Sequence, residues 1–207
     1  MPSWIEFFAV SVCAITAVLA AEGKRMDLFG VLVLSLVTAV GGGTIRDVCL
    51  GARPVFWIAQ PLHLWVALIA AVVTFVAVRF IRLPEKLLGI ADAFGLALFG
   101  IAGTEKALAF GTPGIVAVLL GIVTGVAGGI LRDVLRREIP WVFQAGVSLY
   151  ATAVFAGATV FVLLRRWLPP SESHRYIGMA VILIMRLAAM RWKLRLPVFR
   201  THAAPPS

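Results

Sequence analysis

Two copies of an arginine–aspartate pair are the residues of this sequence most capable of chemistry. Arg46 and Asp47 lie in the stretch GGGTIRDV, and Arg132 and Asp133 lie in AGGILRDV, 86 residues later. Both pairs stand in long apolar runs, where a charged residue costs roughly 2.5–3.5 kcal/mol on translocon scales. Such a charge needs a partner or water, so the pairs indicate an ion or solute pathway. The alternative is that each pair lies near a helix end, extends to the membrane surface and merely terminates the span.

Glycines precede each pair, and each glycine lowers helix propensity by about 1 kcal/mol relative to alanine. Broken backbone inside a membrane is tolerated only where protein or a water-filled cavity satisfies it. We therefore expect a glycine-broken helix in each copy, with freed carbonyls and half-helix dipoles lining a pathway. Neighbouring helical residues point about 100° apart, so one member of each pair should line the lumen while the other pairs elsewhere, for instance with its counterpart across the repeat interface. The predicted pathway residues are Gly41, Gly42, Gly43, Thr44, Arg46, Asp47, Gly128, Gly129, Arg132 and Asp133.

Other polar residues are weaker candidates. Asp92, Glu105 and Lys106 flank the fourth apolar run, either as interfacial groups or as pore or gate contacts. His63 and His174 have no serine or cysteine at a spacing that suggests nucleophilic catalysis. No cysteine or histidine spacing resembles a metal site. The sequence therefore predicts no enzyme, no cofactor and no metal.

The elements that must position these residues are membrane spans. The 207 residues are 61% hydrophobic and 14% charged, and their mean hydropathy is +0.98, which indicates lipid as the solvent. The net charge of +9 could suggest a nucleic-acid partner. However, most Lys and Arg residues stand at the ends of apolar runs, as topology signals and lipid-headgroup anchors do, so we expect membrane lipids and no nucleic acid.

We predict an all-α transmembrane fold of seven helices. The predicted spans are residues 4–21, 28–50, 61–80, 88–108, 113–135, 146–164 and 175–192. The motif recurs at an offset of 86 residues, and Pro54 and Pro140 keep that offset. Each repeat holds three spans, an odd number, so the second repeat enters the membrane from the opposite side.

The resulting organisation has four parts. Residues 1–84 form the first three-helix repeat, residues 88–169 the second and inverted repeat, residues 175–195 a seventh helix, and residues 196–207 a disordered cytoplasmic tail. About twelve Lys and Arg residues fall on one side of the membrane and about five on the other. The positive-inside rule therefore puts the C-terminus in the cytoplasm and the N-terminus outside, and the first apolar run reads as a span rather than a cleaved signal peptide.

The doubled GGGTIRD and AGGILRD motifs, the three-plus-three-plus-one span count and the Pro-aromatic stretch after each motif resemble the bacterial branch of the TRIC family, the trimeric intracellular cation channels. The resemblance implies a homotrimer in a bacterial inner membrane, with a pore inside each subunit between the inverted repeats. It implies a gate near the glycine kinks of the second and fifth helices. The permeant ions would be potassium or sodium, with potassium favoured. Paired Arg-Asp motifs equally suit the alternative, a secondary transporter for a small amino acid such as glycine.

Overall fold

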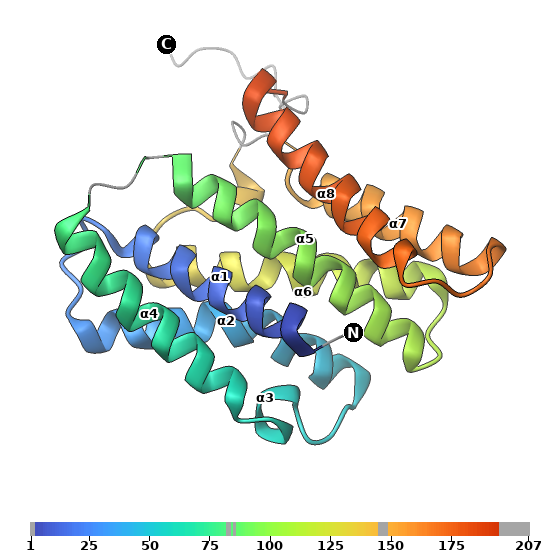
Figure 1. Ribbon diagram of the computed structural model, residues 1–207, viewed down its shortest axis with the longest axis horizontal. Coiled ribbons are helices and arrows are strands. Elements are labelled where there is room, and N and C mark those ends of the chain that lie inside the picture. The colour runs from blue at the N-terminus through green and yellow to red at the C-terminus, as the bar shows by residue number, and fades with distance from the viewer. Residues whose placement is uncertain (1–2, 82–83, 85, 145–148, 195–207) are drawn as a thin grey trace, which may run out of the picture.

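A computed structural model of the chain describes residues 3–81, 84, 86–144 and 149–194, and this part is all-helical (Figure 1). Its elements are α1 (Ser3–Ala21), α2 (Leu28–Leu50), α3 (Phe56–Ala59), α4 (Leu62–Phe80), α5 (Lys86–Ala109), α6 (Gly114–Leu135), the 3₁₀ turn η1 (Trp141–Phe143), α7 (Ala151–Trp167) and α8 (Ser173–Trp192). Each of the seven long helices coincides with a predicted span to within a few residues. The predicted tail, residues 196–207, and the predicted start of the sixth span at residue 146 lie outside the described residues.

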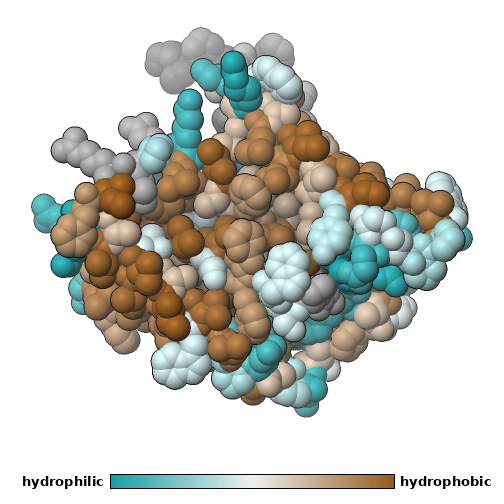
Figure 2. Space-filling view, viewed as in Figure 1, coloured by the Kyte–Doolittle hydropathy of each residue, from teal (hydrophilic) through white to brown (hydrophobic). Residues whose placement is uncertain are grey.

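Six of the long helices in the described part are long and apolar enough to cross a membrane. The exception is α7, which has 17 residues and carries Arg165 and Arg166 in its last turn. α4 exposes large apolar side chains, among them Trp65, Ile69 and Phe80, as a helix that faces lipid does. Figure 2 shows hydrophobic side chains covering the region of α4 and much of the same face. The protein is therefore an integral membrane protein.

The helices pack as two triplets with one helix added. α1, α2 and α4 contact one another, and so do α5, α6 and α7, while α8 packs on α5 and α7 (Figure 1). The triplets meet through α2 against α6 and α1 against α5. Buried apolar residues such as Leu96, Ile101 and Ile182 form the core of the second triplet with α8. The core of the first triplet is built largely from alanines, which allow its helices to lie close together.

The predicted glycine break is wrong, because α2 is helical through Gly41–Gly43 and α6 is helical through Gly128 and Gly129. Because these glycines have no β-carbon, α2 and α6 can pack closely against each other. This packing offsets the low helix propensity of glycine. Asp27 caps the N-terminus of α2, and its side chain accepts a hydrogen bond from the Gly30 amide at 2.7 Å. The short helices α3 and η1, which follow the two Arg-Asp motifs, were not predicted.

An ion pair joins the two triplets at one end. Lys24, after α1, contacts Glu138, after α6, and both side chains are partly exposed. The hydrogen bond from Lys24 lowers the pKa of Glu138 below its usual value. Both groups are therefore charged at neutral pH, although an exposed pair of this kind adds little stability.

The turn after α6 holds an arginine in a left-handed conformation. Arg137 has a φ of +59°, and the residue 86 positions earlier, Gly51, has a φ of +65°. Glycine takes this conformation without a β-carbon penalty. We expect Arg137→Gly to stabilise the protein by about 0.5–1 kcal/mol, measured as a rise of a few degrees in the midpoint of thermal unfolding in detergent. Arg137→Ala removes the same side chain and keeps the strain, so an equal gain from alanine would contradict this explanation.

Candidate functional site

The first Arg-Asp pair fastens the end of α2 to the segment that follows it. Asp47 is fully buried, and one of its carboxylate oxygens, Oδ1, accepts from Arg46 Nε at 2.8 Å. Its other oxygen accepts the backbone N–H of Phe56, the first residue of α3, at 2.9 Å. Lys106 Nζ, from the last turn of α5, lies 2.7 Å from Oδ1. A single carboxylate therefore ties together α2, α3 and α5.

The second pair repeats this arrangement at the end of α6. Asp133 Oδ1 accepts from Arg132 Nε at 2.8 Å, and Oδ2 accepts the backbone N–H of Trp141, in η1, at 3.2 Å. The guanidinium of Arg132 lies over the Trp141 ring at 5.2 Å, as that of Arg46 lies over Phe56 at 5.6 Å. The two motifs therefore make equivalent contacts, from the Arg-Asp pair to the aromatic residue that follows Pro54 or Pro140.

The expectation that Arg and Asp would point apart, with pairing across the repeat interface, is wrong for both motifs. Each arginine bonds its own neighbouring aspartate. The arginine side chain is long enough to bend back along the helix end, so the directions of the two β-carbons do not decide which groups can meet. Thr44 is also structural, since its hydroxyl donates to the Val40 carbonyl and accepts from the Trp57 indole of α3.

The glycines before each motif let α2 and α6 cross in direct backbone contact. A β-carbon on Gly42 would overlap the carbonyl oxygen of Thr124, and a β-carbon on Gly128 would overlap that of Thr38. The crossing is reciprocal, because Thr124 and Gly128 stand 86 residues after Thr38 and Gly42. It lies near the middle of both helices. The other predicted glycines face side chains: Gly41 faces Leu131, Gly43 faces Phe56 and Gly129 faces the Tyr150 hydroxyl.

The two motifs lie toward opposite ends of α5. The first meets Lys106 and the second meets Asp92, whose carboxylate lies 2.9 Å from Arg132 Nη1. Fourteen residues of helix separate these contacts, a length of about 21 Å. Glu6 and Asp92 are 86 residues apart, so each triplet carries a carboxylate on its first helix in addition to the pair on its second.

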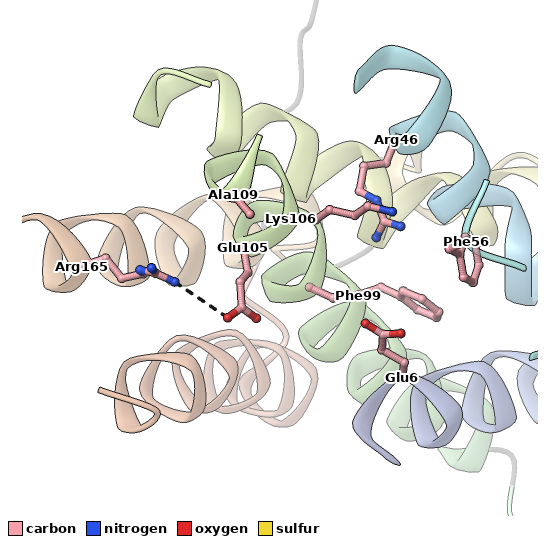
Figure 3. Close-up of a pocket in the computed structure, with 9 residues that line it drawn as sticks. Glu6, Arg46, Phe56, Phe99, Glu105, Lys106, Ala109 and Arg165 are labelled. Carbon is pink, nitrogen blue, oxygen red and sulfur yellow. Dashed lines mark ion pairs between the residues drawn. The ribbon is translucent and has the colours of Figure 1, made fainter. Parts of the chain in front are cut away.

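A cavity of about 320 Å³ opens beside the first motif. Figure 3 shows Arg46 and Lys106 on one side of it, Glu6 opposite, and Phe99 and Phe56 between them. Glu105 and Arg165 stand at its rim, 3.8 Å apart. Glu105 also accepts two hydrogen bonds from Arg175 of α8, at 3.0 and 2.6 Å. The cavity thus contains both signs of charge, and its rim joins α5 to α7 and α8.

The second motif is closed by comparison. Arg132 has no exposed surface, and Asp92, Asp133 and Tyr150 are buried with it. The Tyr150 hydroxyl bonds Asp92, and Arg186 of α8 lies over the Tyr150 ring at 4.5 Å. Equivalent motifs therefore occupy different environments: the first faces a cavity and the second is sealed by an ion pair.

The three residues predicted as interfacial groups or as pore or gate contacts lie in two different places. Lys106 and Asp92 do contact the motifs, whereas Glu105 contacts α7 and α8 instead. The missed side chains are Glu6, His63, Tyr150, Arg175 and Arg186. Glu6 could have been found, since it precedes Asp92 by the same offset that relates the motifs. Arg186 belongs to α8, which has no counterpart in the first triplet, so no internal comparison pointed to it.

Comparison with known proteins assigns the family. A family model described as "Glycine transporter" matches two segments, residues 3–79 and 89–166. The UPF0126 inner membrane protein YadS of Escherichia coli K12 is 46% identical over 198 residues, covering 95% of each chain. A UPF0126 membrane protein of Deinococcus radiodurans is 38% identical over 197 residues, covering 95% of this chain and 91% of the relative.

Solved structures agree with these relatives. The TRIC trimeric intracellular cation channel orthologue from Rhodobacter sphaeroides is 37% identical, with a TM-score of 0.86 over 92% of this chain and 97% of that one. The chain belongs to the TRIC channel family. A second TRIC cation channel structure, 32% identical, aligns over 99% of this TRIC-family chain with a TM-score of 0.88. The resemblance found in the doubled motif is confirmed.

Proposed function

We propose that this chain is a monovalent cation channel, preferring potassium, with a pore in each subunit of a homotrimer. The observation that carries the proposal is the charged cavity beside the first motif, which residues of α1, α2, α5 and α7 line. Solved members of the family are described as trimeric cation channels. The reciprocal Thr–Gly contacts and the twofold match of the family model support two inverted three-helix repeats with the pathway between them.

The proposed pathway runs along α5 from the cavity to the second motif. With the N-terminus outside and the C-terminus in the cytoplasm of a bacterial inner membrane, the cavity faces outward and the Asp92–Arg132 pair faces the cytoplasm. The gate lies near the glycines of α2 and α6, where the two backbones touch. Conduction requires the helices to separate there and the buried ion pair to open.

The arginines in this pathway do not contradict cation passage. A guanidinium repels cations unless a carboxylate neutralises it, and both arginines are bonded to aspartates at 2.8 Å. Glu6 and Glu105 add two carboxylates to the cavity lining. Arg46 and Lys106 both pair with the single carboxylate of Asp47, so these three side chains carry one excess positive charge.

The test is electrical recording from purified protein in planar bilayers. We expect unitary potassium currents, larger than sodium currents, and we expect Lys106→Gln to raise the conductance because it removes a positive charge from the cavity. Lys86→Gln changes an exposed lysine at the start of α5 and should leave the conductance unchanged. If the double variant Asp47→Asn with Asp133→Asn alters neither flux nor selectivity, the motifs are structural only.

The cavity also keeps the glycine-carrier alternative testable, because Lys106 and Glu6 could hold the carboxylate and the ammonium of a zwitterion. The description of the matching family model favours the same solute. Absence of unitary currents together with saturable glycine uptake into proteoliposomes would establish the carrier and reject the channel. Currents of many ions per opening would reject the carrier.

A further inference from the structure

His63 is buried behind the cavity, next to Glu6, which lines it. One nitrogen of the His63 ring contacts a backbone carbonyl, and the other lies near the Glu6 carboxylate. Nδ1 lies 2.9 Å from the backbone carbonyl of Gln60. A carbonyl oxygen only accepts, so Nδ1 carries a hydrogen and donates it. Nε2 lies 3.4 Å from Glu6 Oε2. The tautomer is therefore fixed by the Gln60 carbonyl, and the state of Nε2 depends on Glu6.

A proton on either group would favour the approach of Nε2 to Glu6. A neutral ring with its hydrogen on Nδ1 presents a lone pair at Nε2, which would face the lone pairs of an ionised carboxylate. Nε2 is buried and makes no hydrogen bond to any group in the described part of the chain. A proton on Nε2 or on the Glu6 carboxyl turns this repulsion into an attraction.

We propose that Glu6 and His63 form a proton-binding site that controls cation entry into the cavity. His63 is 1% exposed and is held between Phe7, with ring centres 4.9 Å apart, and Phe56, at 5.0 Å. The two aromatic contacts and the Nδ1 contact with the Gln60 carbonyl hold the ring in place, with Nε2 3.4 Å from Glu6. The Glu6 side chain is 36% exposed and lines the cavity, so the proton exchanges with cavity water.

Other charges that face this site are fixed in pairs. From α2 come Arg46 and Asp47, which bond each other, and from α5 comes Lys106, which bonds Asp47. Glu105 of α5 is bonded to Arg175 and lies near Arg165 of α7. At the Glu6–His63 pair, by contrast, one added proton changes the charge next to the cavity without breaking a strong ion pair.

The second triplet supplies a natural contrast. There the carboxylate equivalent to Glu6 is Asp92, and its ring partner is Tyr150, which donates a hydroxyl. A phenol keeps its proton throughout the physiological range, whereas an imidazole gains and loses one between about pH 5 and 8. The cavity end of the pathway is therefore the pH-sensitive end, and the sealed end is not.

The direction of the effect follows from the charge. Raising the pH on the cavity side removes the shared proton and leaves a negative carboxylate facing the cavity. One unit of charge about 6 Å from a cation changes its local concentration by roughly threefold in water-like surroundings. The cation conductance should therefore rise by about that factor as the cavity-side pH increases from 5 to 8.

The effect on cation conductance rests on the proposed function, so proton binding is measured in a separate experiment. The sequence has three histidines, His63, His174 and His202. In a variant that retains only His63, ¹⁵N NMR of labelled histidine should show Nε2 gaining a proton between about pH 5 and 8, with the transition moved by Glu6→Gln. An unchanged His63 spectrum across this range would overturn the proposal.

The flux arm uses proteoliposomes or bilayers with the cavity-side pH varied and the opposite side held constant. We expect His63→Gln and Glu6→Gln each to abolish the pH-dependent rise, and His174→Gln to retain it. A rise that survives both His63→Gln and Glu6→Gln would also overturn the proposal. Titration of His63 without any current under any condition would instead reject the channel and leave the proton-binding site standing.

Discussion

Arg132→Met is expected to destabilise the folded protein by about 3–5 kcal/mol, because removing one partner of a buried ion pair leaves the other charge uncompensated. Arg132 has no exposed surface, and it bonds both Asp92 and Asp133 at 2.9 and 2.8 Å. Methionine fills a similar volume without a charge. The loss therefore reports chiefly Asp92, whose ion pair is with Arg132, whereas Asp133 keeps Arg136 at 3.3 Å. Thermal unfolding in detergent micelles should show a fall in the midpoint on the order of 10 °C.

Arg46→Met is the matched control, since the same residue type is removed from the equivalent motif. Asp47 would keep Lys106 at 2.7 Å and the Phe56 amide, beside a cavity that water can enter. We expect less than half the loss seen for Arg132→Met. Adding Asp92→Asn to Arg132→Met should recover part of the stability, because it removes a stranded charge. Equal losses for the two single arginine variants would contradict the difference in surroundings between the two motifs, one beside a cavity and one closed.

Gly42→Ala and Gly128→Ala are expected to cost about 2–3 kcal/mol each, at the upper part of the range for overpacked sites. In both cases the added methyl meets a backbone carbonyl oxygen of the opposite helix, which cannot move aside as a flexible side chain can. The helices must then separate along the whole crossing. The midpoint of thermal unfolding should fall by several degrees for each variant.

Gly89→Ala provides the comparison within α5. Its new methyl would meet Met190 Cε at 2.8 Å, the far end of a flexible side chain. Alanine also improves helix propensity by about 1 kcal/mol, so this variant should be neutral or slightly stabilising. If Gly42→Ala behaves like Gly89→Ala, the backbone contact between α2 and α6 is looser than the structure indicates.

Much of the fold could be predicted because lipid imposes a simple rule on sequence. A span needs an apolar run of sufficient length, and each of the seven predicted runs became a helix with boundaries close to those expected. The offset of 86 residues was equally informative, since it relates Gly42 to Gly128, Arg46 to Arg132 and Pro54 to Pro140. Periodicity within the chain carried structural information that hydropathy alone does not.

The glycine run was interpreted wrongly because a run of glycines is compatible with two structures, a broken helix and a closely packed helix. Three glycines lower helix propensity, and they also remove the β-carbons that keep helices apart. What decides between these outcomes is the surface opposite, here the Thr124 carbonyl, which lies 82 residues away from Gly42 in the sequence. Local sequence contains no information about that partner.

The contacts of the site could not be predicted because they depend on side-chain conformation and on residues distant in the sequence. The Arg46–Asp47 bond depends on how the guanidinium bends, and the Asp47–Phe56 bond depends on a four-residue helix too short to carry a periodic signal. His63 was set aside for lack of a catalytic partner, and its importance depends on Glu6, 57 residues earlier.

The reciprocal contact between α2 and α6 has a mechanical consequence. Two helices whose backbones touch at glycines can rotate about that point of contact. This point lies near the middle of a helix about 34 Å long, so each helix end lies about 17 Å from it. A rotation of about 10° would move those ends by roughly 3 Å, comparable to the length of one hydrogen bond. The charged groups stand toward the ends of this lever, so a rotation that hardly disturbs the crossing could exchange one set of ion-pair partners for another.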